Sequence, residues 1–367
     1  MKLQILFSTL TLFMPICLLA EADSIKWSIT DPQVYDLHLP QNLFLGKLGS
    51  NKNQKTCHTQ GLAITDSEIG ISCCLYDPNN RKERTYQNEA YLLSTDLKPL
   101  LSGSTRRPKW RLEKITEFAP LEESERISKS VLEKNGRFDP KRDRFPMGHP
   151  SGIALDEDSK KLMLALSVYG PRGYSRLKQF NLESQSWDKK SYDIPDHLGA
   201  VVPLPKDLIV GPTWGSHEFI VLDRKSGEWR KYPNRLPEQV DYQECEALEK
   251  RIFICSGNLI DREWLVKRRI GKIHLIELIG AHFDSFQFEL KGEIKGDLGV
   301  REFSYQEGEE VVEKRQNRYG TYWIPLTLPN EGLSLSPDQK FIYFLPEDIP
   351  GGRLIRYRLI HPSSSDQ

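Results

Sequence analysis

Three histidines open three copies of a similar phrase, and imidazole is a side chain suited to chemistry near neutral pH. His58 begins HTQGLAI, His149 begins HPSGIAL and His197 begins HLGAVV. Glu331 opens a related phrase, EGLSLS, near the C-terminus. Neutral imidazoles with a carboxylate suit zinc, iron or manganese, and an open coordination position would activate water. These four side chains therefore predict one divalent metal, with Glu244 as a candidate general base.

The phrase itself predicts a β-hairpin that positions these groups. Residues 153–155 are apolar, residues 156–159 are turn formers, and residues 162–168 are apolar again without a helical period. Two apolar runs of strand length around a polar turn are typical of a hairpin. Because the second strand runs antiparallel to the first, its end returns to the face where the first strand began.

Polar and aromatic side chains recur at these two positions of each hairpin, so they are expected to converge on one face, at the mouth of a central channel. Such convergence is typical of a ligand site. A structural role for each group, as a strand cap or a bond to the neighbouring backbone, is the alternative. The predicted ligand-binding residues are His58, Gln60, His149, Tyr169, Arg172, Asp196, His197, Trp214, Tyr242, Asn258, Glu331, Glu347 and Asp348.

The spacing of the phrase predicts an all-β fold, a β-propeller. Further copies begin at Tyr242 and Asn330, and the first small residues of successive copies are separated by 91, 48, 45 and 87 residues. A repeat of about 40–50 residues with several strands is the signature of a propeller blade. Five blades are favoured because neither long gap holds another hairpin phrase; six or seven blades are the alternative.

The ends of the chain and its charged segments complete the predicted organisation. Residues 25–44 alternate like a strand, and the last repeat has about three strands, so an N-terminal strand is expected to close the last blade. A single domain is expected over residues 23–361, with charged insertions near 120–147 and 295–318 and a polar tail at 362–367. A short helix is expected within the first insertion.

Residues 1–22 predict a cleaved signal peptide. Lys2 precedes an apolar run, and Ala20-Glu21-Ala22 fits the A-x-A cleavage pattern. An uncleaved anchor is the alternative, although Pro15 interrupts a run that is short for a membrane span. A secreted or periplasmic protein with no membrane attachment after cleavage is therefore expected.

The charge balance limits the classes of partner that the protein is expected to bind. The 51 basic and 51 acidic residues give a formal net charge of zero, which does not favour nucleic acid or an anionic membrane as a partner. A small ligand or a protein remains as the expected partner, and the protein is expected to be a monomer.

Export permits disulfides, and the hairpins place cysteines in facing positions. Cys245 and Cys255 lie nearly opposite each other across one turn, and Cys57 lies across its own hairpin from Cys73 or Cys74. The sequence leaves two alternatives open: a cross-strand disulfide in each hairpin, or buried free thiols. The spacing CxxC is absent, which disfavours a structural cysteine–zinc site.

Several of these phrases also carry a family resemblance. HTQGLAI, GHPSGIAL, DHLGAVV, WGSHEF, DYQECEAL and EGLSLSPDQKFIYFLPED together resemble a family of uncharacterised secreted propeller-like proteins, a domain of unknown function. The resemblance spans about residues 58–359 and implies a propeller with five hairpin openings of this kind.

Two more distant resemblances concern single phrases. EGLSLSPDQKFIYF resembles a blade opening of gluconolactonase-like six-bladed propellers, and that resemblance implies that Glu331 is a metal ligand. The Asn and Asp ligands of those proteins have no counterpart in this chain. HTQGL is similar to the FTQGL of glutaminyl cyclotransferase-like propellers, with His58 in place of the Phe.

Two functions follow from the sequence. The first is a non-catalytic, exported propeller that binds a small ligand or a protein at the channel mouth. The second is a metal-dependent hydrolase of lactone or ester type, in which His58, His149, His197 and Glu331 hold the metal. No nucleophile elbow, P-loop or dinucleotide fingerprint supports another reaction class.

Overall fold

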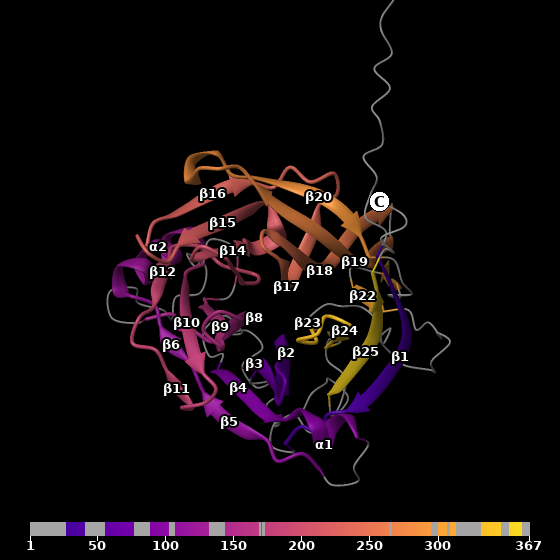
Figure 1. Cartoon of the computed structure of the whole chain (residues 1–367). Coiled ribbons are helices and arrows are strands. Elements are labelled where there is room, and N and C mark those ends of the chain that lie inside the picture. Colours follow the sequence, from indigo (N-terminus) through magenta and orange to yellow (C-terminus); the bar gives the residue numbers. More distant parts are fainter. Residues whose placement is uncertain are drawn as a thin grey trace, which may run out of the picture.

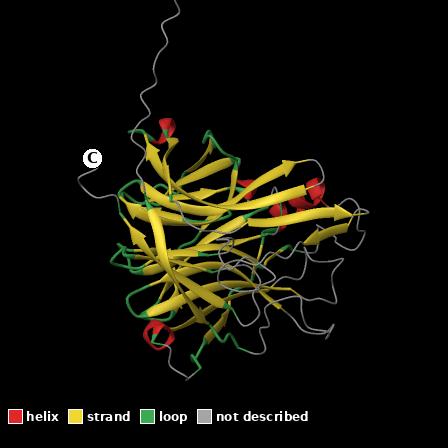
Figure 2. Ribbon diagram, turned by 90° about the vertical axis from the view of Figure 1, so that its right-hand side faces the viewer, coloured by secondary structure: helices red, strands yellow, loops and turns green. Residues whose placement is uncertain are grey.

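The protein is a five-bladed β-propeller, in which five antiparallel sheets are arranged around a central axis (Figure 1). The computed structural model describes residues 27–40, 56–76, 89–102, 107–131, 144–168, 170, 173–263, 266–294, 300–306, 309–312, 332–345 and 352–361. Seen from the side, strands form the body of the molecule and short helices lie at its margins (Figure 2). Five blades are the number favoured by the repeat spacing.

Each blade begins with the strand nearest the axis and runs outward. Blade 1 contains β2 (Thr56–Ile64), β3 (Glu68–Tyr76), β4 (Glu89–Asp96) and β5 (Arg111–Lys114). Blade 2 contains β8 (His149–Asp156), β9 (Lys161–Ser167) and β10 (Ser175–Asn181), with β11 (Ser186–Trp187) and β12 (Tyr192–Ile194) both pairing with β10. Blade 3 contains β13 (Val202–Leu204), β14 (Leu208–Pro212), β15 (Glu218–Asp223) and β16 (Trp229–Pro233).

Blade 4 is the largest sheet. It contains β17 (Val240–Glu249), β18 (Ile252–Glu263), β19 (Val266–Ile279), β20 (Gln287–Glu293), β21 (Val300–Gln306) and β22 (Glu309–Val312). The 14-residue β19 pairs with β20 along one half and with β21 along the other. The charged segment near 295–318 therefore contributes two strands that extend this blade.

Blade 5 joins the two ends of the described chain. It contains β23 (Leu333–Leu335), β24 (Phe341–Phe344), β25 (Arg353–Ile360) and the N-terminal β1 (Ser28–Asp36). β1 pairs antiparallel with β25, from Ser28 opposite Ile360 to Asp36 opposite Arg353. The predicted closure of the last blade by an N-terminal strand is confirmed.

The remaining elements are short. The insertion after blade 1 holds α2 (Leu121–Val131) between β6 (Glu117–Phe118) and β7 (Pro146–Met147), which pair with each other. The helix predicted for this insertion is thus present. The other short elements are α1 (Leu97–Leu101), η2 (Trp214–Ser216) and η3 (Phe283–Ser285). Within the described ranges, no helix is long and apolar enough to cross a membrane.

The hydrophobic core is divided into five clusters, one between each pair of neighbouring blades. Each blade is too thin to bury both faces alone, so burial against its neighbours closes the ring. Side-chain hydrogen bonds reinforce every junction, as expected for buried polar groups. These bonds join Ser72 to the Ser151 carbonyl, Ser151 to the Leu198 carbonyl, Tyr242 N to Ser216, Gln339 to the Leu248 carbonyl, and Ile64 N to Ser334.

One of the two predicted cross-strand disulfides is fully described. Cys245 and Cys255 are direct partners in the β17–β18 register and form a disulfide. Cys73 is also disulfide-bonded, and the Cys57 side chain lies outside the described residues. Cys74 keeps its thiol and is buried.

Candidate functional site

The start of each innermost strand defines one face of the ring, which we call the mouth face. His58 lies on β2, His149 is the first residue of β8, and His197 lies just before β13. Trp214 begins η2, which follows β14 and so returns to the same face. The hairpin geometry predicted from the sequence thus places these four residues at one end of the blades.

Three of these rings are in contact. The centroids of His149 and His197 are 5.2 Å apart, and those of His197 and Trp214 are 4.7 Å apart in an edge-to-face arrangement. The centroids of His149 and Trp214 are 6.3 Å apart. His58 lies within electrostatic range of His149. We call His58, His149, His197 and Trp214 the mouth cluster; it draws on blades 1, 2 and 3.

Burial keeps two of the imidazoles neutral. His149 and His197 are only 7% and 1% exposed. Desolvation lowers the pKa of His149 well below 6.5, and the neighbouring His197 and His58 lower it further. Desolvation also lowers the pKa of His197 to about 4. Both rings are therefore uncharged at neutral pH, while His58 and Trp214 are half-buried.

The tautomer of His197 follows from its hydrogen bond. Its Nδ1 lies 2.8 Å from the carbonyl oxygen of Val168, which can only accept. Nδ1 therefore carries the proton, and Nε2 keeps a lone pair that can accept a hydrogen bond or bind a metal.

The insertion helix α2 fixes the segments that flank His197. The Nη2 atom of Arg126 donates to the carbonyl oxygens of Gly173, at 2.8 Å, and Pro195, at 3.3 Å. Its Nε donates to Glu123 within the same helix, at 2.6 Å. The sequence predicts only a charged insertion with a short helix here, because no local pattern reveals a bond between residues so far apart in the chain.

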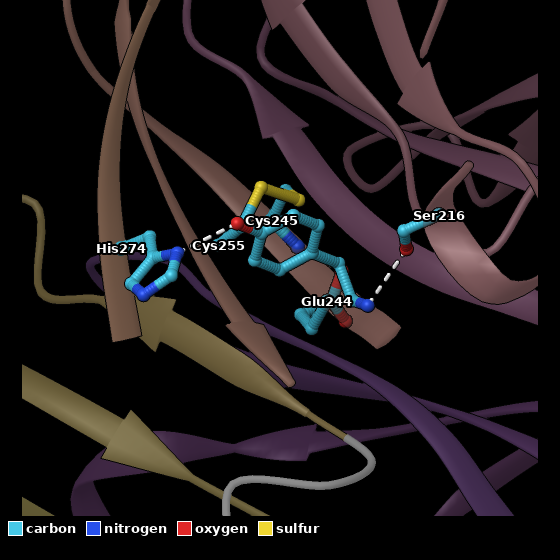
Figure 3. Close-up of a disulfide and its surroundings, with 6 residues drawn as sticks. Ser216, Glu244, Cys245, Cys255 and His274 are labelled. Atoms are coloured by element: carbon cyan, nitrogen blue, oxygen red, sulfur yellow. Dashed lines mark hydrogen bonds between the residues drawn. A yellow bond between two sulfur atoms is a disulfide. The ribbon is translucent and has the colours of Figure 1, made fainter. Parts of the chain in front are cut away.

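Two predicted site residues also have partners outside the mouth cluster. Asp196 forms an ion pair with Lys231 on the outer strand of blade 3 and accepts a hydrogen bond from the backbone of His197. Tyr242 is fully buried, and its hydroxyl lies 2.7 Å from Nδ1 of His274 (Figure 3). Desolvation raises the pKa of Tyr242, so its hydroxyl stays protonated.

His274 was missed because it lies inside the apolar run KIHLIEL, where a histidine gives no periodic signal. It is 1% exposed, and its Nε2 lies 3.6 Å from Oε2 of Glu238. The Tyr242 hydroxyl lies beside its other ring nitrogen, Nδ1. Tyr242 and His274 are both buried, and the pair joins the first and third strands of blade 4. Ligand binding by Tyr242 stays a prediction.

Glu244, the predicted general base, lies on β17 and reaches across the axis. Its Oε2 accepts hydrogen bonds from the backbone N–H of Leu62 on β2, at 3.1 Å, and of Ile153 on β8, at 3.2 Å. Its Oε1 accepts from the N–H of Cys245, at 3.2 Å. One carboxyl group therefore ties blade 4 to blades 1 and 2, whose innermost strands β2 and β8 are each paired on one side only among the described strands.

The carboxyl group of Glu244 is 0% exposed, and burial raises its pKa well above 4.5. The three backbone N–H donors and the nearby Glu246 act on the same pKa, the donors lowering it and Glu246 raising it. These contacts support a structural role, and catalysis by Glu244 stays a prediction. Glu246, which was not among the predicted site residues, is a second buried carboxyl, and burial raises its pKa.

The other described site residues are buried near the mouth face. The Gln60 amide donates to the carbonyl of its neighbour Thr59, at 3.1 Å. Asn258, on β18 and 4% exposed, has a buried Oδ1 that accepts no hydrogen bond within the described part of the chain. The predicted residues Tyr169, Arg172, Glu331, Glu347 and Asp348 lie outside the described residues.

Three of the four predicted metal ligands, His58, His149 and His197, lie within the described residues. Among the described residues, no group of three or more histidine, cysteine, aspartate or glutamate side chains is arranged to hold a metal ion. Glu331 lies outside them, so the complete set of His58, His149, His197 and Glu331 stays a prediction.

Comparison with known proteins gives distant structural matches to propellers. No protein-family model and no curated protein matches the sequence. The WD40 repeats of RRP9 match 91% of this chain and 100% of their own at 11% identity, with a TM-score of 0.40. A Trypanosoma rangeli sialidase matches 85% of this chain and 45% of its own at 12% identity, with a TM-score of 0.43.

A functionally unknown protein from Desulfotomaculum acetoxidans matches 78% of each chain at 10% identity, with a TM-score of 0.37. At these levels the matches carry no argument about function. The similarity to a family of uncharacterised secreted propellers stays a resemblance, since no family assignment supports it.

Proposed function

We propose that the protein is a non-catalytic β-propeller that binds a small ligand at its mouth face through the mouth cluster. The observation that carries the proposal is the mutual contact of His149, from blade 2, with His197 and Trp214, both from blade 3. Two neutral imidazoles and an indole offer aromatic faces together with hydrogen-bonding nitrogens. Such a combination suits a neutral organic ligand that stacks on the indole and donates a hydrogen bond to His197 Nε2.

The rigid surroundings of the cluster support binding. His197 is fixed through Nδ1 by the Val168 carbonyl, and Arg126 holds the backbone at Gly173 and Pro195. A site whose side chains are held in place before binding loses less conformational entropy when the ligand arrives.

The test is a screen of small neutral ligands by thermal shift, followed by titration with intrinsic tryptophan fluorescence. We expect Trp214→Leu and His149→Gln to abolish the shift that a hit produces on the wild-type protein. His282→Gln is the matched control, because His282 is exposed and lies next to η3 in blade 4. A hit that binds both mouth variants with wild-type affinity would refute the mouth cluster as the binding site.

A metal-dependent hydrolase of lactone or ester type is the second candidate. Neutral His149 and His197 are in the form that binds metals, and His197 Nε2 has a lone pair available. Elemental analysis of the mature protein tests this candidate together with His149→Ala and Glu331→Gln. About one metal per chain, lost in both variants, would favour the hydrolase; no metal and no uptake of zinc, calcium or manganese would exclude it.

We also propose that the protein is exported after cleavage near residue 22, to the periplasm or the exterior. The Cys245–Cys255 disulfide and the disulfide-bonded Cys73 support an oxidising compartment. Mass spectrometry of the protein from its native host is the test. A mature N-terminus at Asp23 is expected, and an intact Met1 on the bulk of the protein would contradict the proposal.

A further inference from the structure

The opposite face of the ring carries a cavity that the mouth cluster does not use. We call this side the turn face, because the turns between the first and second strands of the blades lie there. β8 runs from His149 on the mouth face to Asp156, so its eight residues separate the two faces by about 25 Å. A cavity of about 380 Å³ opens on the turn face where blades 1, 2 and 5 meet.

The cavity has an apolar part and an acidic part. Leu155, Leu182 and Pro337 supply the apolar surface. Four carboxylates and one ammonium supply the charge, a formal net charge of −3 from the lining side chains. The acidic side chains are Asp66, Glu68, Glu157 and Glu183, and the basic one is Lys160.

The distribution of partners within the lining indicates where a ligand would bind. Glu157 is neutralised by an ion pair with Lys160, and Oε1 of Glu68 by an ion pair with Arg111 on β5. The other oxygen of Glu68, Oε2, is buried and accepts no hydrogen bond from any residue that the structure describes. A buried acceptor without a donor is unfavourable, so a donor from a ligand that enters the cavity would be favoured there.

A metal ion does not fit this arrangement of carboxylates. No three acidic, histidine or cysteine side chains in the described part of the chain are close enough together to hold one. Carboxylates that are spread around an apolar surface instead match a cation with an aliphatic body, whose methylene groups can contact leucine and proline while its charged end reaches a carboxylate. A volume of this order also accommodates a small organic molecule.

We propose that this turn-face cavity binds an aliphatic ammonium group, and that Glu68 and the exposed Asp66 and Glu183 recognise its charge. Glu68 Oε2 would accept a hydrogen bond from the ammonium, and the apolar lining would contact the alkyl chain. The ammonium could belong to a free aliphatic diamine or to a lysine side chain of a peptide, since both present the same chemistry.

The test is isothermal titration of the full-length mature protein with 1,5-diaminopentane and, separately, with a tri-lysine peptide. Saturable binding of the diamine would identify a free-amine site, whereas binding of the peptide alone would identify a lysine-recognition site. We expect the double variant Asp66→Asn/Glu183→Gln to bind the preferred probe about tenfold more weakly, which corresponds to about 1.4 kcal/mol. Both side chains are exposed, so this variant should fold normally.

Two further measurements separate charge recognition from general effects. Lys160→Gln removes the competing ammonium and should tighten binding, whereas Glu289→Gln, on the outer strand β20 of blade 4, should leave it unchanged. Added salt should weaken binding. Saturable binding of 1,5-pentanediol with equal affinity, equal effects of the Glu289 and Asp66/Glu183 variants, or no binding of either probe at millimolar concentration would overturn the proposal.

Discussion

Gly152 and Glu244 form a matched pair at the axis of the propeller. A Cβ atom at residue 152 would lie 2.0 Å from Oε1 of Glu244, well inside van der Waals contact. The carboxyl group of Glu244 occupies the space that the absent side chain leaves and bonds the next N–H along β8, that of Ile153. The glycine of the phrase HPSGIAL is therefore a requirement of the axial contact.

Gly152→Ala should destabilise the protein by about 3 kcal/mol, because an atom is forced into a packed, polar interior. Urea unfolding of the mature protein measures the change. In a Glu244→Ala background the same glycine substitution should cost much less, since the obstructing carboxyl group is gone. Equal costs in the two backgrounds would show that the two residues do not interact.

Glu244→Ala alone should lower the free energy of unfolding by at least about 3 kcal/mol, because three buried backbone N–H groups lose their acceptor. Glu244→Gln should cost less, since its amide oxygen can still serve some of these donors. Unfolding curves of both variants provide the measurement. If a hydrolytic activity is found, retention of that activity in the folded Gln variant would argue against Glu244 as its general base.

Removal of the Cys245–Cys255 disulfide should also lower stability. The bond closes a loop with a sequence separation of 10, for which loss of the cross-link is expected to cost about 2–3 kcal/mol. Unfolding of the Cys245→Ala/Cys255→Ala variant measures this cost. Dithiothreitol should destabilise the wild-type protein by more than it destabilises the variant; an equal effect on both would place the reductant's action at other cysteines.

The buried histidines predict a pH dependence of stability. The pKa of His197 falls from 6.5 to about 4 on folding, so the unfolded chain binds a proton that the folded protein excludes between these values. The histidine contribution to the free energy of unfolding is therefore complete above pH 6.5 and falls by about 3 kcal/mol as the pH approaches 4. His149, whose pKa is also lowered, adds to this loss.

The buried carboxyls change the pH dependence of the free energy of unfolding in the opposite direction to the histidines. A variant is therefore needed to separate the two contributions. Because burial raises the pKa of Glu244 and Glu246, their contribution is present below pH 4.5 and is lost as the pH rises. His197→Asn can keep a donor for the Val168 carbonyl but cannot titrate. Unfolding between pH 4 and pH 7 should show a shallower acid loss in this variant than in the wild type; parallel curves would contradict the prediction.

The fold was largely predictable because its signals are local. Alternating apolar residues around polar turns identify each hairpin, and the spacing of the hairpins gives the number of blades. The strand at Ser28–Asp36 was also predictable, since an incomplete last repeat leaves an edge that needs a partner. The face on which His149, His197 and Trp214 lie followed from antiparallel strand direction alone.

The orientations of single side chains were less predictable, because β-bulges recur at the same point of three hairpin phrases. The registers shift between Thr59 and Gly61, between Pro150 and Ile153, and between Tyr242 and Glu244. One extra residue in a strand reverses the alternation of side chains beyond it. The two-residue period of a strand therefore does not predict which face those side chains occupy. A bulge leaves no clear mark in residue types.

The sequence by itself determined the repeated hairpins, the five blades, the closure of the ring and the end of the blades at which the histidines gather. Only the tertiary structure decided that Glu244 crosses the axis, that Tyr242 turns to His274, and that an acidic cavity opens on the turn face. The physical reason is the distance along the chain between the residues in contact. Hairpins follow from neighbours within about 20 residues along the chain, whereas these contacts join strands of different blades or strands separated by an intervening one, and they exist only once the ring has closed.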